Sequence, residues 1–274
     1  MKIKKTQWIW HLILILCVII LLFPILFAIS NSFKTLSDAY KNVFELIPLH
    51  PTLENYKKVF ENLPFVKITI NTFIIATVVT LCKTITSLLA AYAFVYLPFK
   101  GKNTLYFIML ANMFIPFTVT MIPNYLMISR IGLTDSMWGV MLPQLADVLG
   151  IFMLRQAMRG IPKSLIEVVN LEKVGNLKIL SDIVVPLIRP SIMSIGIIFF
   201  INSWNEYVWP VLILKTKDNY TLSLALQMYI SAEGGTDFTV AMAVSVMTMV
   251  VPVILYLIFQ KFIINTFAMS GIKG

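Results

Sequence analysis

The chain has 274 residues, of which 58% are hydrophobic and only 13% are charged, and its mean hydropathy is +0.85. This composition excludes an ordinary soluble domain and indicates a protein of the lipid bilayer. The formal net charge of +9 does not point to nucleic acid, because the basic residues are spread over separate segments with no groove-forming domain between them.

Six stretches of the sequence are long and apolar enough to cross a membrane. The hydrocarbon core is about 30 Å thick, so a crossing helix needs about 20 residues with few charges. Lipid cannot satisfy a bare backbone, so the crossing segments must be helical. We therefore predict an all-α integral membrane protein, one domain over 1–274, with six transmembrane helices. They are expected at residues 9–29, 68–97, 105–128, 138–154, 191–214 and 240–260.

The first stretch has a competing interpretation, because Lys2, Lys4 and Lys5 precede it as in a secretory signal. However, its apolar run of 21 residues is long for a signal, and the FAIS run at 27–30 is a poor cleavage site. We therefore expect a retained membrane span.

The lysines and arginines of the connecting segments decide the orientation. The two termini and the segments after the second and fourth stretches hold thirteen basic and three acidic residues, whereas the other segments hold eight of each. Both termini and the loop 159–190 are therefore expected in the cytoplasm. Residues 30–67 fall outside and are too short to bury a core of their own. We expect them to form an external cap, with a short helix that begins near Thr52.

The motifs of enzymes and cofactor sites are missing from the sequence. It holds no GxxxxGK[ST] loop for ATP, no HExxH and no GxSxG, and its two histidines, His11 and His50, lie on different segments. Cys17 and Cys82 lie inside predicted spans and are expected to act as apolar side chains. We expect no catalytic residue, no metal site and no cofactor in this chain.

The segment 164–190 is the one long amphipathic, charged stretch on the expected cytoplasmic side. Its SLIE run at 164–167, which follows Pro162, has the pattern of a capping box and predicts that a helix begins there. Gly175 and Asn176 are expected to end this helix before a second short one. The segment is thus predicted to form a helix-turn-helix between the fourth and fifth spans. The pattern alone also fits a loop that rests its apolar side on lipid headgroups.

Motifs of this segment and of the rest of the chain resemble one protein family. Glu167, Gly175 and the PLIRP run at 186–190 resemble the EAA signature of permease subunits of binding-protein-dependent ABC importers, which have the MetI-like fold. The resemblance is closest to the maltose-type, carbohydrate-uptake branch. Further motifs resemble the family in order along nearly the whole chain: NSFK at 31–34, AAYAF at 90–94, FKGK at 99–102, IP at 122–123, GL at 132–133, FMLRQ at 152–156, SWNE at 203–206, WP at 209–210 and SGIKG at 270–274.

The chain departs from this family inside the signature itself. Val168 and Val169 stand where the family usually has two alanines, Glu172 where it has an aspartate, and Lys173 where it has a glycine. The bulkier side chains predict that this helix seats differently on its partner. Either the turn has moved two residues, to Gly175, or Lys173 stays helical.

The resemblance implies an assembly and a mechanism. The chain would pair with a second, homologous permease, and two cytoplasmic ATPase subunits would each hold one such short helix. An extracellular or periplasmic binding protein would deliver a carbohydrate-type solute, all at a bacterial cytoplasmic membrane. ATP-driven closure of the ATPases would then reorient the membrane helices.

The residues expected to couple to the ATPase follow from the same resemblance. Glu167 would make a charge-assisted contact with a basic ATPase residue, Gly175 would provide the turn, and the neighbouring apolar side chains would supply docking area. The full set is Ser164, Glu167, Val168, Val169, Leu171, Glu172 and Gly175.

Three charged residues, Lys83, Asp147 and Glu206, fall inside the predicted spans. A charge at the bilayer centre costs about 2.5 to 3.5 kcal/mol even on the lenient insertion scale, so each should meet a partner or water. Lys83 has three open interpretations: a place on the translocation pathway, an ion pair with Asp147 or Glu206, or a side chain that reaches the interface. Together with Asn205, these residues are the predicted pathway set.

The aromatic and proline residues of the spans carry weaker expectations. Trp204 and Trp209 are expected to be interfacial anchors, with the lining of the translocation cavity as the alternative. Kinks are expected at four prolines, namely Pro116, Pro123, Pro210 and Pro252.

Two other classes of function remain as alternatives. An ion-coupled secondary transporter or channel would use Lys83, Asp147 and Glu206 as a relay but would leave the cytoplasmic helix without a role. A membrane scaffold for an enzyme would explain that helix but not the intramembrane charges.

Overall fold

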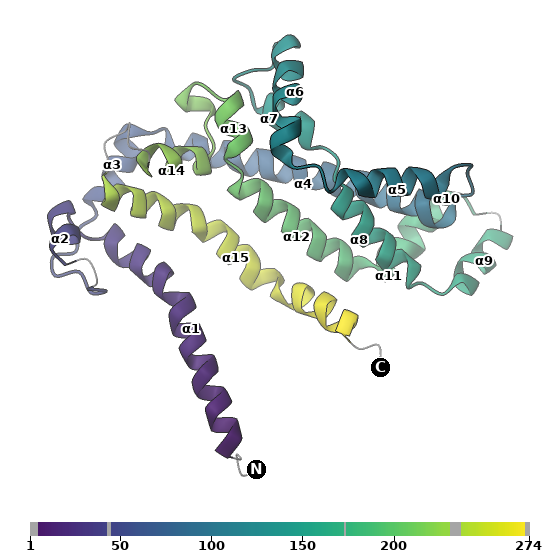
Figure 1. Cartoon of the computed structure of the whole chain (residues 1–274), viewed down its shortest axis with the longest axis horizontal. Coiled ribbons are helices and arrows are strands. Elements are labelled where there is room, and N and C mark those ends of the chain that lie inside the picture. Colours follow the sequence, from purple (N-terminus) through teal and green to yellow (C-terminus); the bar gives the residue numbers. More distant parts are fainter. Residues whose placement is uncertain (1–4, 43–44, 173, 231–236, 272–274) are drawn as a thin grey trace. The chain divides into compact units, whose positions relative to one another are not determined.

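In the computed structural model, the chain is helical, with no strand among the residues that the structure describes (Figure 1). These residues are 5–42, 45–172, 174–230 and 237–271, without the side chains of 5–7, 163, 170–171, 229–230 and 261–271. The all-α prediction is confirmed. The elements are α1 Lys5–Ser32, α2 Leu36–Lys41, α3 Glu54–Asn62, α4 Phe65–Tyr96, α5 Lys102–Asn112, α6 Phe117–Arg130, α7 Met137–Met141, η1 Leu142–Gln144, α8 Val148–Arg159, α9 Lys163–Leu171, α10 Asn176–Ile179, η2 Leu180–Val184, α11 Val185–Leu187, α12 Arg189–Asn205, α13 Val208–Ile213, η3 Lys217–Asn219, α14 Leu222–Ile230 and α15 Phe238–Gly271.

Within the described residues, three helices are long and apolar enough to cross a membrane unbroken, over Trp8–Ser32, Phe65–Tyr96 and Phe238–Gln260. They coincide with the predicted stretches 9–29, 68–97 and 240–260. Their side chains are mostly exposed within this chain, as expected for helices that face lipid.

The other three predicted spans are not the single straight helices expected for 105–128, 138–154 and 191–214. α5 and α6 meet at a 97° bend, and α7 with η1 meets α8 at 44°. α12 ends at Asn205, and α13 begins only at Val208. Pro116 accounts for the first break, because it precedes α6 with extended backbone and the residue before a proline avoids the helical region. The other two breaks lie at Asp147 and Glu206.

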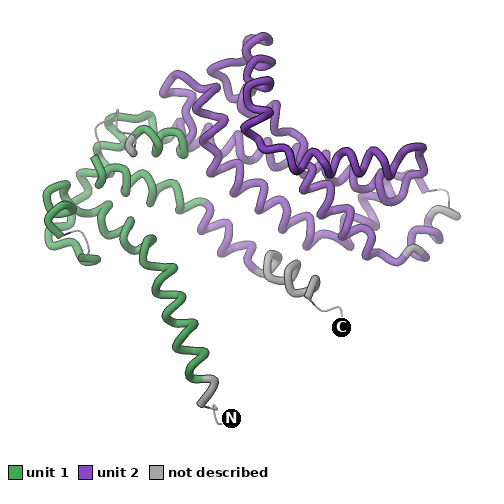
Figure 2. Tube along the Cα trace, in the orientation of Figure 1, with its two compact units in different colours: residues 1–66, 222–251 green, residues 67–221, 252–274 purple. Residues whose placement is uncertain are grey.

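The chain divides into two compact units, residues 1–66 with 222–251 and residues 67–221 with 252–274 (Figure 2). The expected external cap, residues 30–67, lies almost wholly in unit 1 and contains two helices, α2 and α3. The helix predicted near Thr52 is α3, and the Thr52 hydroxyl accepts a hydrogen bond from the Glu54 amide at 3.1 Å.

Unit 1 is joined by the side chain of Asn55 on α3, which is only 2% exposed. Its amide nitrogen donates to the carbonyl oxygens of Ser32 (2.8 Å) and Lys34 (2.7 Å) beyond the end of α1. Its oxygen accepts from the Thr239 hydroxyl at the start of α15, at 2.9 Å. All of the hydrogen-bonding groups of a buried amide should be satisfied, and here they connect three helices. The cap is therefore fixed to the ends of α1 and α15.

Unit 2 has an apolar core shared by α4, α8 and α12. Leu154 and Met158 on α8 pack with Ile195 and Phe199 on α12 and with side chains at the end of α4. Gly150, at the start of α8, lets these helices approach closely. A Cβ atom there would lie 2.5 Å from both Phe199 Cζ and Ser87 Oγ.

We predict that Gly150→Ala destabilises the protein by about 1–3 kcal/mol, because the added methyl group overpacks the α4–α8–α12 contact. Gly196→Ala is the matched control, since a Cβ atom there would meet only Thr84 Oγ1, at 4.0 Å. In a helix, that exchange should be neutral or stabilising by up to about 1 kcal/mol. Thermal unfolding of the purified variants in detergent measures the difference. Equal midpoints for the two variants would show that the close contact does not exist.

Candidate functional site

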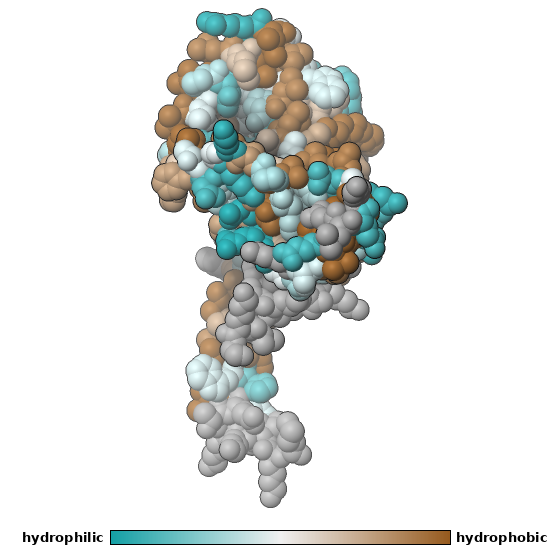
Figure 3. All heavy atoms as spheres, turned by 90° about the vertical axis from the view of Figure 1, so that its right-hand side faces the viewer, coloured by the Kyte–Doolittle hydropathy of each residue, from teal (hydrophilic) through white to brown (hydrophobic). Residues whose placement is uncertain are grey.

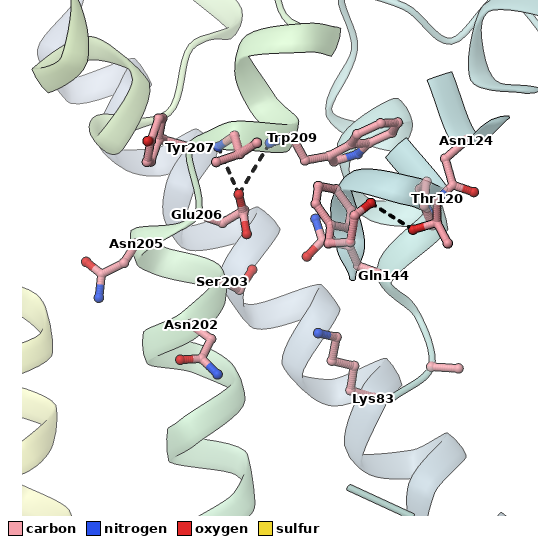
Figure 4. Close-up of a pocket in the computed structure, with 14 residues that line it drawn as sticks. Lys83, Thr120, Asn124, Gln144, Asn202, Ser203, Asn205, Glu206, Tyr207 and Trp209 are labelled. Carbon is pink, nitrogen blue, oxygen red and sulfur yellow. Dashed lines mark hydrogen bonds between the residues drawn. The ribbon is translucent and has the colours of Figure 1, made fainter. Parts of the chain in front are cut away.

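A polar cavity of about 630 Å³ lies in unit 2, where the interrupted helices meet (Figure 4). Its walls come from α4, α6, η1 and the turn after it, α12 and α13. The polar side chains that line it are Lys83, Thr120, Asn124, Gln144, Asn202, Ser203, Asn205 and Glu206. Phe117, Tyr207 and Trp209 add aromatic surface.

Lys83 on α4 is directed into this cavity (Figure 4). Its Nζ atom lies 3.4 Å from Asp147 Oδ2 and 5.4 Å from the centroid of the Phe199 ring. Both members of the ion pair are largely buried, with side chains 14% and 26% exposed. Of the three interpretations of Lys83, the structure contains the ion pair with Asp147, and it places the same ammonium group at the cavity wall.

The two carboxylates at the helix breaks each cap a helix. Asp147 Oδ1 accepts from the Gly150 amide at 3.1 Å, at the start of α8. Glu206 Oε1 accepts from the amides of Val208 (2.9 Å) and Trp209 (3.3 Å), at the start of α13. The first amides of a helix have no partner within the helix and attract negative charge. Three of the predicted pathway residues line the cavity: Lys83, Asn205 and Glu206. The fourth, Asp147, is not part of the lining but forms the ion pair with Lys83.

One wall of the cavity is formed by α13, which is held against α7. The Trp209 indole nitrogen donates to the Gly139 carbonyl at 3.2 Å. A Cβ atom on Gly139 would lie 2.1 Å from the Leu133 carbonyl oxygen, so this position accepts only glycine. Trp204 and Trp209 are 0% and 1% exposed. The expectation that they anchor the protein at the membrane interface was therefore wrong, because both rings are packed inside unit 2.

Asp135 ties the same two helices together at their ends. It has a positive φ of 56°, a conformation that aspartate tolerates better than most residues. Its Oδ1 atom accepts from the amides of Lys215 (2.8 Å) and Thr216 (3.1 Å), and its own amide donates to the Ile213 carbonyl at 2.7 Å. The Lys215 amide contributes most to a pKa of Asp135 that is lowered to about 2.

The second predicted site is α9, which begins at Lys163, so Ser164 lies in its first turn rather than ahead of it as the capping-box pattern predicted. Ile166 is 5% exposed and packs on the core of unit 2, and Val169 packs against the same core. Val168 is 58% exposed, and Ser164, Glu167 and Glu172 are exposed as well.

Two expectations for the coupling set change as a result, and a third is untested. Val169 faces the protein's own core, so it adds little docking area. Gly175 has φ −66° and ψ 145° with nothing near its Cβ position, so its backbone does not require glycine. The side chain of Leu171 and the whole of Lys173 lie outside the described residues.

The fold and the cavity define a class: a helical membrane protein whose interrupted spans enclose a polar chamber, as in a solute permease. Residues 83–267 match the family described as binding-protein-dependent transport system inner membrane component, and the chain belongs to this family. The resemblance stated from the motifs is thus confirmed, and the chain is a permease of an importer that works with a binding protein. The ion-coupled alternative is not favoured.

Relatives match along nearly the full length. The arabinooligosaccharides transport system permease protein AraQ of Halalkalibacterium halodurans is 30% identical over 93% of this chain and 92% of its own. The sn-glycerol-3-phosphate transport system permease protein UgpE of Escherichia coli is 29% identical over 92% of each. The fold is that of a bacterial ABC transporter involved in the import of the acidic polysaccharide alginate, with a TM-score of 0.81, 22% identity and coverage of 95% and 99%.

Asp135 gives a prediction for the contact between α7 and α13. Asp135→Gly removes the carboxylate without strain, because glycine adopts a positive φ freely, and it should lower the thermal midpoint at neutral pH. The folded-state pKa of about 2 lies below the ordinary value of 3.8. The carboxylate therefore stabilises the fold above about pH 4, and this contribution is lost as the pH falls through 2.

The measurement is the midpoint of wild type and variant in detergent from pH 7 to pH 2. The gap between them should narrow on acidification. Asp135→Asn keeps an oxygen acceptor and the left-handed backbone. At neutral pH its midpoint should therefore fall between those of wild type and Asp135→Gly. The difference in midpoint between the asparagine and glycine variants should not depend on pH, because neither side chain titrates. A glycine variant whose deficit is constant over the whole range contradicts the role of the carboxylate.

Proposed function

We propose that this chain is one of two homologous permeases of an ATP-driven importer for a carbohydrate-type solute in a bacterial cytoplasmic membrane. The observation that carries the proposal is the two-sided packing of α9. One face, through Ile166 and Val169, is anchored in the core of unit 2, and the other face, with Glu167 and Val168, is exposed. A cytoplasmic ATPase holds this exposed face.

The proposed topology has six spans and both termini in the cytoplasm. α1, α4 and α15 cross unbroken, whereas α5 with α6, α7 with α8, and α12 with α13 each cross as an interrupted pair. The excess of basic residues at the termini and in the loop 159–190 supports this orientation. The cap of residues 30–67 and the loop held by Asp135 then lie on the outside, where the solute-binding protein docks.

Movement of α9 reaches the cavity through a continuous series of packed side chains. Ile166 belongs to the same core cluster as Leu154 on α8 and Phe199 on α12. Phe199 in turn contacts the Lys83 ammonium group and closes against Gly150. Packed cores shift between discrete arrangements rather than deforming smoothly. A pull on α9 therefore repositions the helices that bear Lys83 and Asp147.

The cavity suits a hydroxyl-rich solute. Its polar lining is mainly neutral amides and hydroxyls, which donate to and accept from sugar hydroxyl groups. Ser203 belongs to this lining, and its Oγ atom is buried with no hydrogen-bond partner among the described residues. The names of the relatives include a system for arabinooligosaccharides, which agrees with such a solute.

The charged residues of the cavity have structural roles that argue against an ion relay. Asp147 pairs with Lys83 and caps α8, and Glu206 accepts from two backbone amides. Neither carboxylate is free to carry protons or cations without undoing a helix cap.

The whole proposal can be tested by purifying the chain from its native host together with the proteins bound to it. The complex should contain a second permease and an ATPase, and a sugar-loaded binding protein should stimulate ATP hydrolysis by the reconstituted complex. A chain that purifies as a homo-oligomer and takes up solute by a proton gradient alone would overturn the proposal.

Val168→Asp tests the coupling face. We expect uptake and ATPase co-purification to fall about tenfold or more, because docking would bury an unpaired carboxylate. Val168→Ala is the matched control and should retain function, since it removes only two methyl groups. The thermal midpoint should stay unchanged in both variants, because Val168 is 58% exposed. Normal uptake by the aspartate variant at normal expression would show that this face is not the docking surface.

A further inference from the structure

Four basic residues gather where α4 ends, α5 begins and α8 ends. Arg155 and Arg159 lie four residues apart on α8, so they share a face of that helix. Lys100 lies in the turn after α4, and Lys102 is the first residue of α5. These four residues, Lys100, Lys102, Arg155 and Arg159, are called the basic cluster below. Figure 3 looks onto this end of the molecule, where hydrophilic side chains gather.

The two inner members of the basic cluster are held in place. The Arg155 guanidinium lies 3.9 Å above the centroid of the Tyr106 ring. The Lys102 ammonium donates to the carbonyl oxygens of Val95 and Leu97, both at 3.1 Å, at the end of α4. The two cations are close enough to repel each other. Their positions are thus fixed before any ligand arrives.

No carboxylate in the described part of the chain forms an ion pair with the basic cluster; the ion pairs found there involve other lysines and His50. Arg155 Nε and the Tyr106 hydroxyl are both buried and lack a hydrogen-bond partner among these residues. Gathered cations with unfilled donors need an anion, and a guanidinium held flat is suited to phosphate oxygens.

The surface beside the basic cluster identifies the source of that anion. No residue of α5 is buried, and Leu105 and Ile108, which continue the face of Lys102 at spacings of three residues, are 53% and 60% exposed. This apolar face begins one turn from Lys102. A phosphate attached to acyl chains satisfies both surfaces at once, whereas a free phosphate or an acidic protein loop would leave the apolar face uncovered.

We propose that Arg155 and Lys102 bind the phosphate of an anionic phospholipid whose acyl chains lie along α5. The orientation proposed above places this lipid in the inner leaflet. A net negative headgroup is required, because a zwitterionic lipid carries its own ammonium group and would meet the uncompensated charges of the basic cluster.

The experiment is native mass spectrometry of the intact purified importer with phosphatidylglycerol or phosphatidylcholine. Wild type should retain more phosphatidylglycerol than phosphatidylcholine. The double variant Arg155→Gln with Lys102→Gln should retain at least about tenfold less phosphatidylglycerol than wild type. Lys178→Gln is the matched control, because it removes an exposed charge outside the basic cluster. Arg155→Lys keeps the charge but loses the flat guanidinium, so it should retain an amount between those of wild type and the double variant.

A second measurement guards against misfolding of the double variant. Phosphatidylglycerol should raise the thermal midpoint of wild type and of Lys178→Gln but not that of the double variant, and millimolar inorganic phosphate should not substitute for it. The proposal is overturned if wild type retains both lipids equally, if the double variant retains as much phosphatidylglycerol as wild type, or if inorganic phosphate gives the same stabilisation.

Discussion

The structure depends on one constraint: inside a bilayer, every backbone amide and carbonyl must find a partner within the protein. Each break in a membrane helix exposes such groups, and here polar side chains satisfy amides at the breaks. Asp147 caps α8, and Glu206 caps α13. Ser136 accepts from the Gly139 amide at the start of α7, at 3.1 Å. The polar cavity lies at these interruptions. Of these capping residues, Glu206 also lines the cavity, and Asp147 pairs with Lys83 at the cavity wall.

The same contacts explain why charged residues are tolerated inside the predicted spans. Lys83 would be costly alone in a span, but Asp147 supplies a counter-charge, and that carboxylate is itself stabilised by the helix that it caps. Glu206 is stabilised by two amides rather than by a cation. The cavity therefore presents one paired lysine and one capped glutamate among neutral amides and hydroxyls. Such a lining suits the solute proposed above, because many modest hydrogen bonds would allow release as well as entry.

The sequence predicted the all-α class, the three unbroken spans, α3, the position of α9 and the family, because these depend on hydropathy, capping patterns and ordered motifs. It did not predict the breaks at Asp147 and Glu206, since an apolar window has the same composition whether its helix is straight or interrupted. Thr120, Asn124, Gln144 and Asn202 were missed for a related reason. Isolated neutral polar residues are common in spans, and only the tertiary fold brings these four around one chamber.

The two faces of α9 show a feature that the sequence pattern does not predict and that tertiary packing determines. Val168 and Val169 are neighbours of equal hydrophobicity, yet one is exposed and the other packs on the core, because Ile166 fixes the rotation of the helix. Gly175 extends the argument. Its φ of −66° and the open space around it mean that this chain would accept a larger residue there. Any requirement for glycine at this place in the motif must therefore come from a surface that docks against it. The same holds for Val168, whose side chain has no place in the core. Under the proposed function, the ATPase that holds α9 would select the side chains at these two exposed positions, because the fold does not.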